Sequence, residues 1–125
     1  FVPREAADVF QKKYGDCKDM SSIIVTMLKL ANVEAYMTWI GTRDRPYKYK
    51  EVPCPIVDNH MIAVAKINNN DVFLDGTGEY QPFGLPTSMI QGKQAMIGID
   101  SVNYQIVEVP IIDAEQSQRI ENASF

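Results

Sequence analysis

Apolar residues recur at three- and four-residue steps between positions 17 and 31, which is the period of an α-helix with one buried face. The pattern predicts a helix from about Cys17 to Leu30, with Asp19 in its first turn. Asn32 can end this helix in a left-handed conformation. The apolar positions that carry the period are Ile23, Ile24, Met27, Leu28 and Ala31.

A shorter amphipathic pattern precedes this helix. Pro3 followed by Glu5 suits a helix start, because proline loses no hydrogen bond there and an acid meets the helix dipole. Lys12 and Lys13 fall in the last predicted turn, and Gly15 is expected as the C′ residue. The predicted apolar face consists of Ala6, Val9, Phe10 and Tyr14.

Strand patterns follow the two helices. Branched and aromatic residues predict a first strand that Gly41 closes, and the asparagine-rich segment 68–71 predicts a hairpin between the second and third. The polar tail 113–125 has little periodicity and is predicted to be a linker or a fraying end. The predicted strands span 34–40, 59–67, 72–74, 94–99 and 102–109.

Residues 42–58 form an irregular stretch that interleaves basic and aromatic side chains. Loops of this length are usually functional or mobile, so one interpretation is a lid that contacts substrate through Tyr47 and Tyr49. The other, which we favour, is an ordinary solvated basic loop. Its basic residues are Arg43, Arg45, Lys48 and Lys50.

Composition excludes several classes of protein. The 125 residues, 46% hydrophobic, suffice for the core of one globular domain. The net charge of −4 and the pI near 4.9 argue against nucleic acid or an anionic membrane as a main partner. No apolar run approaches the roughly 20 residues that cross a bilayer. The chain shows neither an initiator methionine nor a signal peptide, and we expect it to be a piece of a longer protein.

The chemistry that stands out is a cysteine at a helix start. Unpaired N–H groups and the helix dipole favour a thiolate at Cys17, and Lys18 adds a positive charge. The other cysteine, Cys54, lies between two prolines. The two thiols can form one bridge at most, and with a single histidine they make a poor zinc set.

A nucleophilic Cys17 needs a base and a group that orients the base. His60 is the one histidine of the chain, and Asp75 lies at the end of the next predicted strand. If the hairpin turn centres between Asn68 and Asn69, Ile62 lies opposite Asp75 and His60 is its diagonal neighbour on the same face. A shift of half a residue would place the two on opposite faces.

Each of the three residues also has an ordinary structural interpretation. A lone cysteine before an apolar helix is more often a small core residue, and a lone strand histidine is more often structural. Asp75 before Gly76 can cap a turn. The joint order of cysteine, histidine and aspartate, each on a suitable element, favours a site.

Three blocks of the sequence resemble the motifs of bacterial transglutaminase-like domains. The blocks are Tyr14-Gly15-Asp16-Cys17-Lys18-Asp19, Asp58-Asn59-His60-Met61-Ile62 and Phe73-Leu74-Asp75-Gly76-Thr77, and segments 84–86 and 91–95 resemble the stretch that follows in this family. The resemblance covers roughly residues 3 to 98. The block before the histidine is often Phe-Asn-His in this family, whereas here it is Asp58-Asn59-His60.

The resemblance implies a papain-like α+β fold over residues 1–112, with the helices packed on an antiparallel sheet. It implies thiol acyl transfer or hydrolysis at amide bonds, with Cys17 as nucleophile, His60 as base and acid, and Asp75 as orienting group. A peptide or protein substrate, cell-envelope material included, flanking domains and an extracytoplasmic bacterial location are implied as well; no cofactor is expected. Gln11 is a candidate oxyanion donor by analogy with papain-like proteases, but a surface helix glutamine is the interpretation that we favour.

Two alternatives stay open. The first is a catalytically silent module of the same fold that binds protein or ligand. The second is a metal site of Cys17, His60 and Asp75 with one open position, although no short paired-ligand spacing accompanies it. Cys54 is expected to be an incidental thiol, with a redox cap on Cys17 as the alternative.

Overall fold

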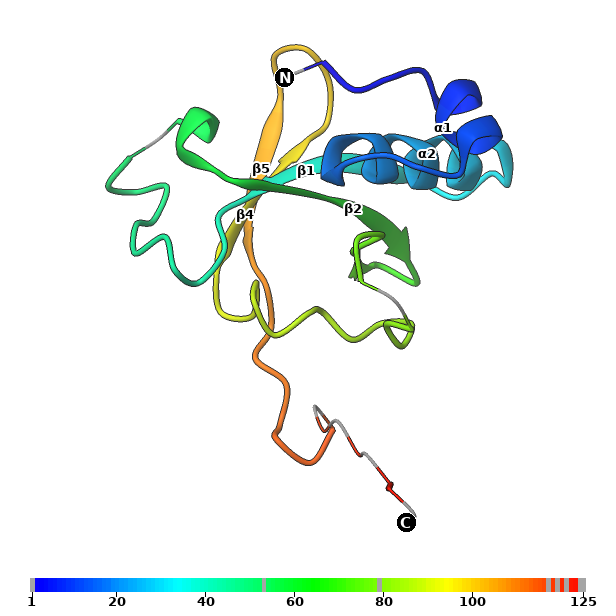
Figure 1. The fold of residues 1–125 in the computed structure, drawn as a ribbon. Coiled ribbons are helices and arrows are strands. Elements are labelled where there is room, and N and C mark those ends of the chain that lie inside the picture. The colour runs from blue at the N-terminus through cyan, green and yellow to red at the C-terminus, as the bar shows by residue number, and fades with distance from the viewer. Residues whose placement is uncertain are drawn as a thin grey trace.

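The fold is known from a computed structural model, which describes residues 2–52, 54–78, 80–116, 118, 120 and 122–123. Two helices precede a five-stranded sheet in which all neighbouring strands run antiparallel (Figure 1). The α+β class is therefore correct. Within the described ranges, no helix combines the length and the apolar character needed to cross a membrane.

Helix α1 (Ala6–Lys12) follows an extended Glu5 and ends at Lys13, which adopts the left-handed conformation with φ of 52°. The prediction of Gly15 as the left-handed residue is therefore wrong. Gly15 is needed for another reason, since a Cβ there would lie 2.5 Å from the Cβ of Asp19. The predicted apolar face is only partly buried, because Val9 is buried while Phe10 and Tyr14 are exposed.

Helix α2 (Cys17–Leu30) has the predicted bounds. Asp16 caps it by accepting hydrogen bonds from the N–H groups of Lys18 and Asp19, and the Asp19 carboxylate accepts from Asp16 N–H in return. This reciprocal pair is a capping box. Beyond the last turn, Asn32 is left-handed with φ of 59°, which confirms the predicted stop.

The buried face of α2 is displaced from the predicted one. Val25 is buried, and Ile24 and Leu28 pack beside it, whereas Met27 is 55% exposed. The helix lies on small residues of the sheet, Ala35, Ala63 and Ala65, which form one buried cluster with Val25. These small side chains let the helix backbone approach the sheet closely, and Val25, Ile24 and Leu28 fill the space between them.

The strand order in the sheet is β3-β2-β1-β4-β5. The turn between β2 and β3 uses Asn68 and Asn69, both with positive φ, as a two-residue hairpin turn requires. The ladder pairs Ala63 with Leu74, so the turn centres between the two asparagines. The strands are β1 (Ala35–Ile40), β2 (His60–Ile67), β3 (Asn70–Leu74), β4 (Gln94–Gly98) and β5 (Tyr104–Glu108).

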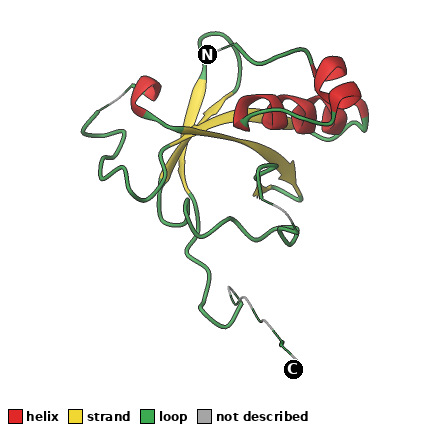
Figure 2. Ribbon diagram, viewed as in Figure 1, coloured by secondary structure: helices red, strands yellow, loops and turns green. Residues whose placement is uncertain are grey.

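Two apolar clusters sandwich the sheet. The helices gather on one side (Figure 2), over the alanine-lined cluster. The second cluster joins alternate residues of the strands to Ile90 and Val109 from the loops. The described part of the loop between β1 and β2 contains one short 3-10 helix, η1 (Pro55–Val57), which leads into His60. The site therefore stands where the α2 N-terminus, this loop and the start of β2 meet.

Candidate active site

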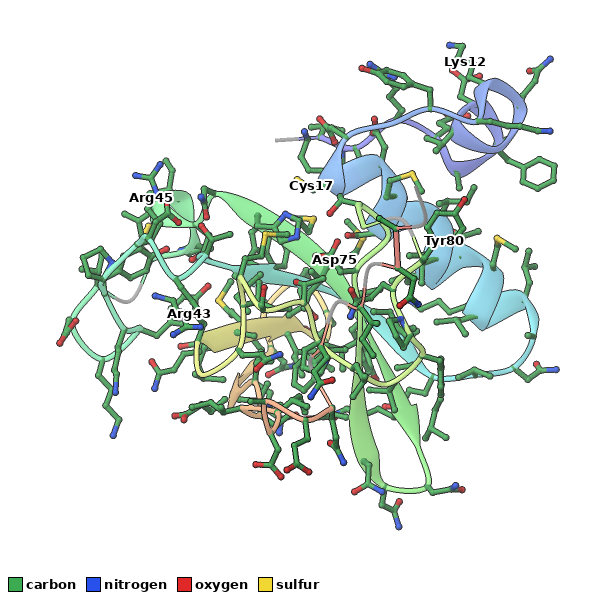
Figure 3. The ribbon with its side chains drawn as sticks, turned by 60° about the horizontal axis from the view of Figure 1, so that its bottom comes forward. Lys12, Cys17, Arg43, Arg45, Asp75 and Tyr80 are labelled. Atoms are coloured by element: carbon green, nitrogen blue, oxygen red, sulfur yellow. The ribbon has the colours of Figure 1, made fainter. Side chains whose placement is uncertain are left out.

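Cys17 is the first residue of α2, and its side chain is half-buried (Figure 3). Lys18 follows it, but the Lys18 ammonium forms an ion pair with Asp16. The hydrogen bond between them raises the pKa of Lys18 and lowers the pKa of Asp16. The Asp16 carboxylate thus balances the Lys18 charge that was expected to favour a thiolate at Cys17. The helix N-terminus is the main remaining feature that would favour a thiolate there.

Ser21 anchors the first turn of α2 to the strand that carries the histidine. Its Oγ lies 2.7 Å from the carbonyl oxygen of Cys17 and 2.9 Å from that of Met61, and the hydroxyl donates its single hydrogen toward both. The side chain is buried. Because Met61 follows His60 directly, this contact joins the backbone at the start of α2 to the strand that carries the histidine.

His60 and Asp75 form a buried pair. The His60 Nε2 lies 2.8 Å from the Asp75 Oδ2, and the two side chains are 8% and 2% exposed. Continuing the register of Ala63 with Leu74 places Asp75 opposite Ile62, with His60 as its diagonal neighbour. The conditional geometry derived from the sequence is the one that the hairpin adopts.

The Asp75 carboxylate has further donors. Thr77 donates to Oδ1 from both its N–H (3.0 Å) and its hydroxyl (2.7 Å), and the Thr87 hydroxyl lies 3.3 Å from Oδ2. Burial raises the pKa of Asp75, but the hydrogen bonds from His60 and Thr77 outweigh it, so this pKa lies below its ordinary value. An ionised Asp75 holds the proton of the neutral imidazole on Nε2 and leaves Nδ1 as the basic nitrogen.

Gly76 allows the turn after Asp75 to pack closely against α2. A Cβ at this position would lie 2.8 Å from Ile24 Cδ1 and 3.1 Å from Met20 Cβ. Distances this short require a neighbour to move, so glycine lets the turn after Asp75 pack directly on the helix. The Gly76 of the third motif block therefore has a packing role beside the site.

Cys17 and His60 line the same small cavity, of about 160 Å³. Trp39 from β1 forms another part of its wall. The cavity can hold a few non-hydrogen atoms, the size of an amide group and its immediate substituents. Its remaining lining residues are Lys18, Asp58, Asn59 and Met61.

Asp58, which departs from the usual motif, is a buried carboxyl in the wall of this cavity. Tyr47 and Tyr49 both donate their hydroxyls to it, one to each oxygen. Burial, followed by the hydrogen bond to Asp58, raises the pKa of each tyrosine. We call Asp58 with these two tyrosines the tyrosine clasp. The contact of Tyr47 and Tyr49 with substrate stays a prediction. The departure from Phe-Asn-His marked Asp58 in the sequence, but not its two tyrosine partners.

Other predicted site residues lie elsewhere. Gln11 is exposed on α1 and is not among the residues that line the cavity. Cys54 is half-buried, and it and Cys17 are free thiols. Within the described part of the chain, no group of three or more histidine, cysteine, aspartate or glutamate side chains is arranged to hold a metal ion.

Comparison with known proteins adds no relative. No protein-family model, curated protein or solved structure matches the chain. The class that the fold defines is a small α+β domain.

Proposed function

We propose that the chain is a transglutaminase-like thiol acyltransferase or hydrolase that acts on amide bonds through Cys17, His60 and Asp75. The observation that carries the proposal is the buried contact of 2.8 Å between His60 and Asp75, beside a cysteine at a helix N-terminus in the same cavity. Nucleophile, base and orienting group are the three parts that such chemistry requires. The family resemblance of the motif blocks supports the same assignment.

In the proposed reaction, Nδ1 of His60 takes the thiol proton and the Cys17 sulfur attacks the amide carbonyl carbon. A C–S bond forms, and the carbonyl oxygen becomes an oxyanion. His60 returns its proton to the nitrogen as the C–N bond breaks, which releases an amine and leaves a thioester. Water or a second amine then attacks the thioester, with His60 taking its proton, and the thiol is regenerated.

Two donors are available for the oxyanion. Among the described residues the Cys17 N–H has no hydrogen-bond partner, as expected at the first position of a helix. We assign the indole N–H of Trp39 as the second donor, because Trp39 lines the cavity whereas Gln11 does not. Donors aimed at a developing negative charge are typically worth about 3–4 kcal/mol each in the transition state.

The proposal is tested with an activated ester, since the natural substrate is not needed to acylate the cysteine. Mixing the protein with p-nitrophenyl acetate should release a burst of one equivalent of p-nitrophenol and acetylate Cys17, as seen by peptide mass spectrometry. Cys17→Ala should abolish the burst, and Cys54→Ser, the matched control, should keep it. A burst that follows Cys54, or none at all, contradicts the proposal.

The second candidate is a catalytically silent binding module of the same fold. Two observations favour it: the small volume of the cavity, and the absence, among the described residues, of a hydrogen bond between Cys17 and His60. A module of this kind would show slow and equal acetylation of Cys17 and Cys54. Adding a primary amine to the ester assay separates a transferase from a hydrolase, because only a transferase forms amide faster than the uncatalysed aminolysis measured with Cys17→Ala.

A further inference from the structure

A recess of about 360 Å³ lies between the loop after β1 and the turn before β4. Its wall carries four cationic side chains and one carboxylate: Arg43, Arg45, Lys48, Lys93 and Glu51. The recess is therefore cationic although the chain as a whole has a net charge of −4. Arg43 and Arg45 lie on the opposite side of the molecule from Lys12 (Figure 3).

Among the described residues, the recess cations form no ion pair, although the carboxylates of Glu51 and Asp44 lie near them. Ion pairs within the described residues involve other basic side chains, and none reaches Arg43, Arg45 or Lys48. The Glu51 carboxylate accepts a hydrogen bond from the backbone N–H of Lys48 at 3.0 Å and so stabilises the loop conformation. Nearby Asp44 accepts from the Thr42 hydroxyl, and the charges of Arg45 and Lys93 add to that bond in lowering its pKa.

The walls of the recess are fixed by hydrogen bonds. Lys93 donates to the carbonyl oxygens of Arg45 and Tyr47, the latter at 3.0 Å, and its ammonium stands 5.0 Å from the Tyr47 ring. Arg43 N–H bonds the Met89 carbonyl at 2.8 Å. The recess is therefore assembled before any ligand arrives, and ordering the loop adds little to the cost of binding.

We propose that this recess binds an anionic ligand through carboxylate or phosphate oxygens. Two guanidinium groups, with two ammonium groups beside them, supply the planar forks and point charges that recognise such oxygens. Binding would also relieve the mutual repulsion of these unpaired cations. The proposal uses no residue of the triad, so it stands or fails independently of the proposed function.

The test is a titration of the isotope-labelled protein with sodium phosphate and, separately, with sodium tricarballylate, followed by amide chemical shifts. Ionic strength is held constant with sodium chloride. We expect saturable shifts in the backbone amides of residues 43–45, 47–48 and 91–94. The double variant Arg43→Gln/Arg45→Gln should bind about tenfold more weakly or worse, because it removes both guanidinium groups from the recess; a tenfold loss corresponds to about 1.4 kcal/mol.

The matched control removes the same number of cations from α1, in Lys12→Gln/Lys13→Gln, and should leave the affinity within about twofold. Saturation with phosphate alone identifies phosphate as the oxyanion, and saturation with tricarballylate alone identifies carboxylate; either supports the proposal. Shifts that never saturate with either anion overturn it, as does equal weakening in both double variants. All these substitutions replace exposed side chains, and circular dichroism confirms that the variants fold.

Discussion

At the scale of single residues, the proposed chemistry depends most on the buried contact between His60 and Asp75. Asp75 is almost fully buried, yet two donors of Thr77 and the imidazole keep its pKa low. A buried carboxylate that accepts several hydrogen bonds orients its partner strongly and is costly to leave unsatisfied. The side chain therefore links folding stability to the proposed chemistry.

Asp75→Asn should show this link as a dependence of stability on pH. A carboxyl with a lowered pKa stabilises the fold above its unfolded pKa of 3.8, and this contribution declines as the pH falls through the folded value. The advantage of the parent over Asp75→Asn in unfolding free energy should therefore be constant near about pH 5 and shrink toward about pH 3. Urea denaturation along this series measures it. A constant advantage over the whole series would refute the lowered pKa.

Ser21→Ala tests the contact between α2 and β2. Both carbonyls that Ser21 approaches belong to regular elements, so losing the hydroxyl should cost only about 1 kcal/mol in urea denaturation. Ester-driven acetylation of Cys17 should slow more than this cost suggests, because the contact sets the cysteine against the histidine. Ser22→Ala, one residue along the same helix, is the control and should leave acetylation unchanged. Equal rates in both variants would remove the positioning role.

At the scale of elements, the start of α2 follows from its own sequence. Gly15, Asp16 and Asp19 make the tight approach and the capping box locally, so the helix bounds were predictable. The hairpin was predictable from segment 68–71, but its register was only conditional until the positive φ of Asn68 and Asn69 placed the turn between them. The buried face of α2 was not predictable, because the helix pattern does not show which small residues of the sheet lie beneath it.

Asp16→Asn separates the cap from its charge. Asparagine caps a helix as well as aspartate does, so stability should be kept. The substitution removes the carboxylate that pairs with Lys18, which frees the ammonium to favour a thiolate at Cys17. We expect alkylation of Cys17 at neutral pH to be about two- to fivefold faster, as charge effects at a helix end are worth about 0.3–1 kcal/mol. A slower reaction would contradict this account of the Cys17 environment.

Gly76→Ala tests the packing of the third motif block on α2. The added methyl group meets Ile24 and Met20 at distances that force a shift, so we expect a loss of about 1–3 kcal/mol in thermal or urea unfolding. Gly78→Ala is the matched control, since the nearest atoms to a Cβ there lie at 3.9 Å. If the two variants were equally stable, close packing at Gly76 would not be needed.

At the scale of the whole molecule, the loop after β1 contributes to two separate regions, the cavity of Cys17 and His60 and the cationic recess. In the sequence this loop is a single stretch of basic and aromatic residues. Tyr47 donates its hydroxyl to Asp58 beside the cavity of Cys17 and His60, while its ring lies under Lys93 at the cationic recess. The tyrosine clasp was not predictable, because Asp58 bonds tyrosines that lie 9 and 11 positions before it in a loop without periodicity. The contact between His60 and Asp75 could be predicted only as a condition on the hairpin register, and the catalytic role proposed for these residues with Cys17 stays a prediction.

The most direct test of the central claim is the rate of iodoacetamide modification at Cys17 against pH, in the parent and in His60→Ala. Peptide mass spectrometry separates Cys17 from Cys54, which serves as the internal reference. We expect a modification rate at Cys17 that stays high well below about pH 8 and falls sharply in His60→Ala. A rate that follows an ordinary free thiol, with a pKa of about 8.5, in both proteins would contradict an activated nucleophile.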